Sequence, residues 1–116
     1  MSGWLNWATI GGDNKFIPKV GANRGNADAI LTVDDAPVVV YDTTLTAARD
    51  VLLPTEGLYN GLAFRLLRTA GGAFALTISD GEGAVATIGS GETGYVDVVY
   101  NGTDWRVLGA GPLTTA

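Results

Sequence analysis

The chain has 116 residues, 47% of them hydrophobic, and a formal net charge of −5, which fits one globular domain. It contains no cysteine and no histidine, so disulfides, cysteine-based metal sites and catalytic arrangements that need either residue are excluded. Only 16% of the residues are charged, against about a quarter in an ordinary domain. Such sparse charge favours a surface that partner chains partly cover.

The distribution of charge and hydropathy bears on the class of partner. No apolar run approaches the roughly 20 residues of a membrane helix, and the first residues lack the basic and apolar regions of a signal peptide. Residues 28–116 carry four arginines against eleven acidic residues, a balance that repels nucleic acid. We therefore expect neither a membrane nor a nucleic-acid partner. Residues 1–27 carry three basic residues and one acidic residue, which suits either an acidic protein surface or a solvated tail.

Residues 1–27 are predicted to form an extended N-terminal arm. Glycines and Pro18 interrupt every periodic pattern there, yet the segment is too rich in aromatic residues for a disordered tail. Its apolar side chains are expected to bury against its own domain, a neighbouring subunit or a larger assembly. The residues proposed to anchor the arm are Trp4, Leu5, Trp7, Ile10, Lys15, Phe16, Ile17, Lys19 and Arg24.

From residue 28 onward the pattern changes to short apolar segments separated by turn residues. No stretch keeps the apolar spacing of a helix, and the segments recur about every 8–12 residues, as in sandwiches and barrels. Residues 28–116 are therefore predicted to form a single all-β domain, an antiparallel β-sandwich resembling a jelly roll. The expected strands are 29–33, 38–43, 48–53, 62–69, 74–79, 84–88, 95–100 and 103–109.

Two strand connections invite a more detailed interpretation. Asn101-Gly102 predicts a two-residue type I′ hairpin turn, which would place Tyr100 opposite Thr103. A similar turn at Gly71-Gly72 would place Arg65 opposite Ile78, a poor match that favours a longer loop or a bulge there. In the predicted hairpin one face is a core face. The other face is only half polar, and its apolar members are the proposed subunit interface: Tyr95, Val99 and Leu108.

Two short stretches partly match the motifs of known binding sites, but each lacks a feature that the site requires. The stretch "GSGETG" (89–94) is followed by a strand rather than by the helix that a dinucleotide site requires, so it is interpreted as a turn. The stretch "SDGEG" (79–83) lacks the oxygen ligands of a calcium loop and is also interpreted as a turn. The sequence therefore predicts no catalytic residue, no cofactor and no metal.

Three stretches in order carry a family resemblance: "LTAARDVLLPTEG", "NGLAFRLLRTAGGAFALTI" and "GYVDVVYNGTDWRVLGAG". Through them, residues 28–113 resemble small β-sandwich accessory proteins in the virions of tailed bacteriophages, found in head decorations and fibres. The resemblance implies a homotrimer without catalysis, made in the bacterial cytoplasm and located in the virion. It also implies contacts with the major capsid protein or other virion proteins.

Two functions remain open at this point. In the first, the protein is a capsid decoration (cement) or head-fibre protein whose arm binds the capsid lattice. In the second, it is a receptor-binding or glycan-binding module of a tail fibre or tailspike. Tyr59, Arg65, Arg68 and Arg106 would then contact sugars, whereas in the first case the arginines pair with acidic residues such as Asp97.

Overall fold

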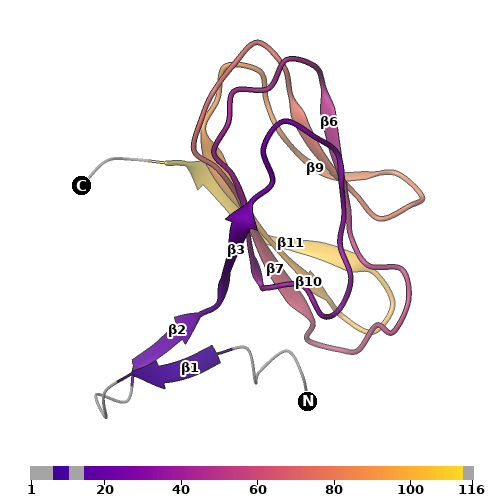
Figure 1. Ribbon diagram of the computed structural model, residues 1–116. Coiled ribbons are helices and arrows are strands. Elements are labelled where there is room, and N and C mark those ends of the chain that lie inside the picture. Colours follow the sequence, from indigo (N-terminus) through magenta and orange to yellow (C-terminus); the bar gives the residue numbers. More distant parts are fainter. Residues whose placement is uncertain (1–6, 11–14, 114–116) are drawn as a thin grey trace.

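A computed structural model describes residues 7–10 and 15–113, with side chains described from residue 19 onward. Within these residues, nine strands form two stacked sheets, and two further strands form a separate hairpin (Figure 1). One sheet has the spatial order β11 (Trp105–Pro112), β10 (Gly94–Tyr100), β7 (Ala63–Arg68), β5 (Val38–Tyr41) and β3 (Val20–Asn23). The other has the order β4 (Ala29–Ile30), β6 (Arg49–Leu52), β8 (Leu76–Ser79) and β9 (Ala84–Ile88).

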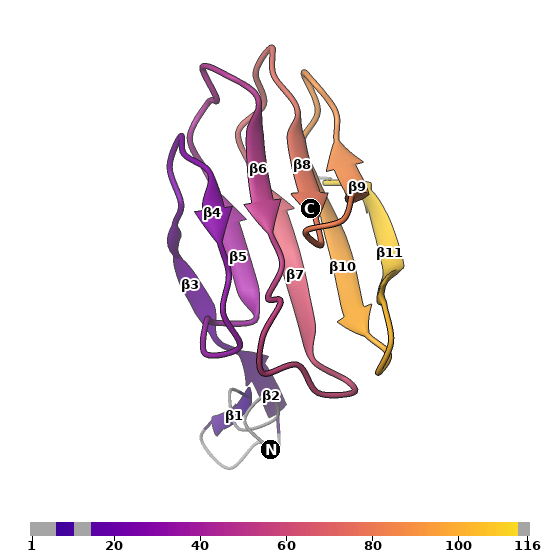
Figure 2. The ribbon, with the colours of Figure 1, turned by 90° about the vertical axis from the view of Figure 1, so that its right-hand side faces the viewer.

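The chain alternates between the two sheets as it runs from β3 to β8. Strands β3, β5 and β7 lie parallel in one sheet, and β4, β6 and β8 lie parallel in the other (Figure 2). Two consecutive strands, one in each sheet, therefore make one coil of a flattened solenoid. The first coil is β3 and β4, the second is β5 and β6, and the third is β7 and β8. Val38 pairs with Arg65 and Arg49 with Leu76, so the second and third coils are related by the same 27-residue offset in both sheets.

The prediction of an all-β, sandwich-like domain is confirmed, but the purely antiparallel arrangement is wrong. Each of the eight predicted segments corresponds to one strand. The expected pairing of 62–69 with 74–79 does not occur, because β7 and β8 lie in different sheets. Residues 69–75 cross from one layer to the other, a distance of about 10 Å that seven residues span easily. This crossing also removes the poor match of Arg65 with Ile78.

Strands β9, β10 and β11 close the solenoid with antiparallel pairs. β9 pairs with β8, and β10 lies between β7 and β11. The predicted hairpin exists, but its two-residue turn is wrong: Tyr100 pairs with Trp105, so residues 101–104 form the loop. The Asn101 side chain accepts hydrogen bonds from the backbone N–H groups of Thr103 and Asp104, at 2.9 and 2.8 Å, which stabilises the longer loop.

The core lies between the two sheets and is built from the inward residues of every strand from β4 to β11. Trp105 closes it at one end, packed against Phe64 and Tyr100 with ring centroids 6.1 and 5.6 Å away. Its indole N–H donates to the Pro54 carbonyl at 3.3 Å, so the polar atom of this side chain is satisfied.

Short polar side chains join the first coil to the second where the chain turns between sheets. Asn23 accepts a hydrogen bond from the Asp42 N–H at 2.8 Å, and Asp28 accepts one from the Asp50 N–H at 2.9 Å. Between them, Asn26 accepts from the Thr46 N–H at 3.0 Å and donates to the Thr46 hydroxyl at 2.6 Å. These bonds replace the strand pairing that the corner lacks.

Tyr41 adds a buried hydrogen bond at the same corner. Its hydroxyl donates to the Ala27 carbonyl at 2.9 Å, and its side chain is fully buried. Burial disfavours the phenolate and raises the pKa of Tyr41 to about 12. Residues 23–28 thus belong to the solenoid, and β3 is a strand of the five-stranded sheet. The sandwich therefore begins at Val20, not at residue 28 as the sequence indicates.

Arg68 is a fully buried cation inside the sandwich. Its Nε donates to the Ala70 carbonyl at 3.2 Å, and its Nη1 donates to the carbonyls of Ile88 and Gly89 at 3.3 and 3.0 Å. Its Nη2 has no hydrogen-bond partner among the residues described. The side chain thereby ties the β7–β8 loop to the β9–β10 loop. Sequence reasoning placed Arg68 on the surface, because arginine is almost never fully buried.

We predict that Asn26→Ala lowers the free energy of unfolding by about 0.5–1.5 kcal/mol, because the corner loses the hydrogen-bond partner of Thr46 and Arg49. Urea unfolding followed by tryptophan fluorescence measures this. Asn60→Ala is the matched control, because Asn60 is exposed and makes no side-chain hydrogen bond in the described structure. Equal effects of the two substitutions would show that the hydrogen bonds of Asn26 do not stabilise the corner between the first and second coils.

We predict that Arg68→Ala costs about 3–5 kcal/mol, because it leaves a cavity and removes the donor for three buried carbonyls. Arg106→Ala serves as the control. Arg106 is exposed and pairs only with Asp104, so its loss changes stability by at most about 0.5 kcal/mol. An Arg68→Ala variant as stable as Arg106→Ala would show that the two loops do not depend on the buried guanidinium.

Candidate assembly surface

The two outer faces of the sandwich differ in polarity. On the four-stranded sheet, the middle of the outer face carries Asp50, Thr77 and Thr87, which are neighbours across β6, β8 and β9. On the five-stranded sheet, the corresponding outward positions are mostly apolar. We call this the apolar outer face, and its members are Val38, Val40, Ala63, Leu67, Tyr95 and Val99.

The apolar outer face is continuous across three strands. Val40, Leu67 and Tyr95 lie side by side on β5, β7 and β10. The sequence "VVVY" of β5 is apolar on both faces, which is typical of strands that are buried on both sides. Within the part of the chain that the structure describes, no strand of the sandwich packs over this face.

One ion pair lies in the middle of this face. Arg65 contacts Asp97 through two hydrogen bonds, from Nε to Oδ1 at 2.7 Å and from Nη2 to Oδ2 at 2.9 Å. The hydrogen bond to Asp97 raises the pKa of Arg65, with burial opposing. The guanidinium also lies 5.8 Å from the centre of the Tyr95 ring, within the range of a cation–π contact. The pair neutralises its own charge and leaves the face without net charge.

The structure places the three predicted interface residues in two settings. Tyr95 and Val99 are half-buried on the apolar outer face. Leu108 lies on β11, and the register shows that it is not opposite Tyr95, which pairs with Gly111. Leu108 is the extra residue of a bulge between the Val98–Val107 and Asp97–Gly109 pairs, and it is 69% exposed.

The predicted arm divides into a hairpin and the start of the sandwich. Strands β1 (Trp7–Ile10) and β2 (Lys15–Pro18) pair with each other in a separate two-stranded sheet, outside the two layers (Figures 1 and 2). This hairpin contains Trp7, Ile10, Lys15, Phe16 and Ile17, whereas Trp4 and Leu5 lie outside the described residues. An isolated two-stranded hairpin is at best marginally stable in water.

Of the last two residues of the predicted anchor, Arg24 belongs to the sandwich and Lys19 directly precedes it. Arg24 donates its backbone N–H to Val40 and pairs with Asp35 at 3.2 Å, so it is not free to anchor an arm. Lys19 is exposed and is the only one of the described cationic side chains without a hydrogen bond or ion pair within the described residues. It stands directly before the edge strand β3.

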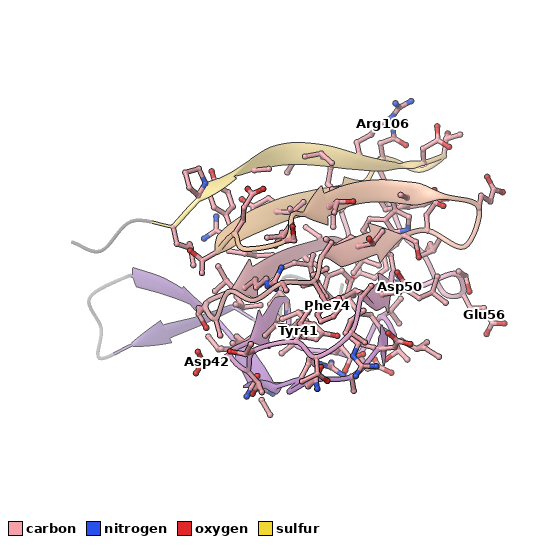
Figure 3. The ribbon with its side chains drawn as sticks, turned by 90° about the horizontal axis from the view of Figure 1, so that it is seen from above. Tyr41, Asp42, Asp50, Glu56, Phe74 and Arg106 are labelled. Carbon is pink, nitrogen blue, oxygen red and sulfur yellow. The ribbon has the colours of Figure 1, made fainter. Side chains whose placement is uncertain are left out.

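The residues that could form a sugar-binding site are not brought together. Arg65 is on the apolar outer face, Arg68 is buried, and Arg106 points away from the body beside β11 (Figure 3). Tyr59 packs partly against the core. A shallow groove of about 380 Å³ lies beside Arg106, with Asp80, Asp104 and Trp105 in its lining. Trp105 is only 7% exposed, so it offers no open ring for a sugar to stack on.

The motif stretches form turns of the sandwich. Asp80 accepts hydrogen bonds from the N–H groups of Glu82 and Gly83, at 2.9 and 3.0 Å, and thereby stabilises the β8–β9 turn. Residues 89–93 form the β9–β10 loop, where Gly91 donates its N–H to the Gly72 carbonyl. Among the residues described, no group of three or more histidine, cysteine or acidic side chains is placed to hold a metal, and no helix is long and apolar enough to cross a membrane.

The sequence was also compared with known proteins. No protein-family model matches the chain, and no curated protein matches it either.

Proposed function

We propose that this protein is a non-enzymatic structural subunit of a tailed-bacteriophage virion, a capsid decoration or head-fibre protein that assembles as a homotrimer. The observation that carries the proposal is the apolar outer face of the five-stranded sheet, centred on Leu67, Tyr95 and Val99. Its larger apolar side chains are mostly half-buried and flank the Arg65–Asp97 ion pair, and apolar patches rimmed by polar residues mark contacts with other chains. The partner in this proposal is a second copy of the chain.

The position of the N-terminal hairpin supports separate roles for the hairpin and the sandwich. Strands β1 and β2 lie outside the sandwich, where they can reach another protein without disturbing the solenoid (Figure 1). Residues 1–18 carry one basic and one acidic residue and are formally neutral, whereas residues 19–116 carry six basic and eleven acidic residues. In this proposal the hairpin binds the capsid lattice, and the sandwich supplies the contacts between subunits.

The family resemblance of the sequence points to the same function. It rests on three stretches that form β6, β7, β8, β10 and β11 with their connecting loops. The second function, a glycan-binding module, has weaker support. The arginines proposed to contact a glycan lie on separate parts of the fold, and the groove beside β11 has no exposed aromatic ring.

We predict that Val99→Lys dissociates the oligomer into folded monomers, because a desolvated lysine in an apolar contact is unfavourable. Light scattering gives the molar mass, and circular dichroism checks the fold. Thr87→Lys, on the polar outer face, is the matched control and is expected to keep the oligomer. An unchanged molar mass for Val99→Lys would place the subunit contact elsewhere.

We predict that removing residues 1–18 leaves a folded oligomer that no longer binds virus particles. The truncation preserves β3, Asn23 and Asn26, which the solenoid needs. Cosedimentation with particles that lack the protein measures binding, and the full-length chain is the positive control. If the truncated chain still decorates the particles, the hairpin is not the anchor.

A further inference from the structure

Both edges of the five-stranded sheet are open for pairing. Strands β3 and β11 each have one neighbour in the sheet. β11 is eight residues long, the longest strand of the protein's described part. Natural proteins protect exposed edges by shortening them or by placing lysine or proline along them. In the four-stranded sheet, edge strand β4 is only two residues long, whereas β11 has a proline only at its last position.

Exposed large apolar side chains gather at these edges. Val20 on β3 is 61% exposed, and Val107 and Leu108 on β11 are 43% and 69% exposed. The bulge on β11, itself a feature that protects edges, carries Leu108, the more exposed of the two β11 residues. Such edges are surfaces for pairing with another chain.

The directions of the two edge strands allow them to pair head to tail. β3 is parallel to β5 and β7, and β11 is antiparallel to β10, which is itself antiparallel to β7. β3 and β11 therefore run in the same direction. Placing β3 of one copy beside β11 of the next gives a parallel pair, and repeating the same contact closes a ring that leaves no free edge in this sheet.

Charge supports the same contact. Lys19, which has no partner among the described residues, precedes β3. The groove at the start of β11 has Asp80 and Asp104 in its lining against the single cation Arg106. In a parallel pair the two strands start at the same end, so Lys19 of one copy meets this acidic groove of its neighbour.

We propose that β3 of one subunit pairs in parallel with β11 of the next, which joins the five-stranded sheets of three copies into a closed ring. This inference rests on the proposed homotrimer and names the contact that builds it. In such a ring the three apolar outer faces turn toward the common axis, where they bury one another.

Cysteine cross-linking tests the contact, because the native chain has no cysteine. The full-length Val20→Cys/Arg106→Cys variant is oxidised and separated on a non-reducing gel, because both residues lie at the start of their strands, where the parallel pair brings them side by side. The expected product is a covalent ladder that ends at the trimer. Val20→Cys alone and Arg106→Cys alone are expected to give no covalent product. Ile30→Cys/Arg106→Cys is the matched control, because Ile30 is equally exposed, at 72%, but lies on the edge of the other sheet.

The alternatives give different patterns. A covalent dimer from Arg106→Cys alone would mean that two β11 edges pair across a two-fold axis, which overturns the inference. An oligomer in light scattering without any cross-link would place the contact on another surface, which overturns the inference but not the proposed function. A monomer in light scattering would overturn both.

A charge reversal provides a second test that does not depend on cross-linking geometry. Lys19→Glu and Asp104→Lys are each expected to weaken self-association several-fold, and the double variant is expected to restore it. Analytical ultracentrifugation at low ionic strength measures the dissociation constants, because such contacts weaken with salt. Single variants that associate like the native chain would overturn the inference.

Discussion

The fold depends on two parallel strand pairings that share one offset. β5 pairs with β7 and β6 pairs with β8, each with partners 27 residues apart. Because the offsets are equal, one turn of the chain brings the inward residues of both sheets into register at once. A change in the length of either crossing loop would move one sheet relative to the other and turn inward side chains outward. The loops are therefore as important to the core as the strands.

Polar side chains at the corners, together with the buried Arg68, hold these loops in place by hydrogen bonds. Asn23, Asn26 and Asp28 provide acceptors for backbone N–H groups at the corner of the second coil. Arg68 provides donors for backbone carbonyls at the loops of the third coil and of the closing strands. Each of these side chains thus forms hydrogen bonds with backbone N–H or C=O groups at the loops. An arginine buried without an acidic partner is costly, and its three carbonyl contacts offset part of that cost.

The same winding leaves the five-stranded sheet unusual in two ways. Its outer face is apolar, and its edge strands β3 and β11 are open and carry exposed apolar residues. The four-stranded sheet, by contrast, has polar residues in the middle of its outer face and a very short edge strand at β4. The proposed homotrimer would explain this asymmetry, because it buries one sheet against other copies and leaves the other sheet in solvent. It would also explain the low content of charged residues in the chain.

The sequence by itself determined the class of fold and the positions of the strands. Alternating apolar residues and turn residues are local signals, so the eight segments from Ala29 onward and the inward positions of β10 could be assigned from the sequence. The half-apolar second face of that strand, with Tyr95 and Val99, was equally visible. The tertiary structure alone decided which strands pair, because a short apolar strand fits a parallel or an antiparallel neighbour equally well. It also decided the burial of Arg68, the inclusion of β3 in the sheet and the four-residue loop after Tyr100. Each of these depends on contacts between residues far apart in the chain, which local patterns do not encode.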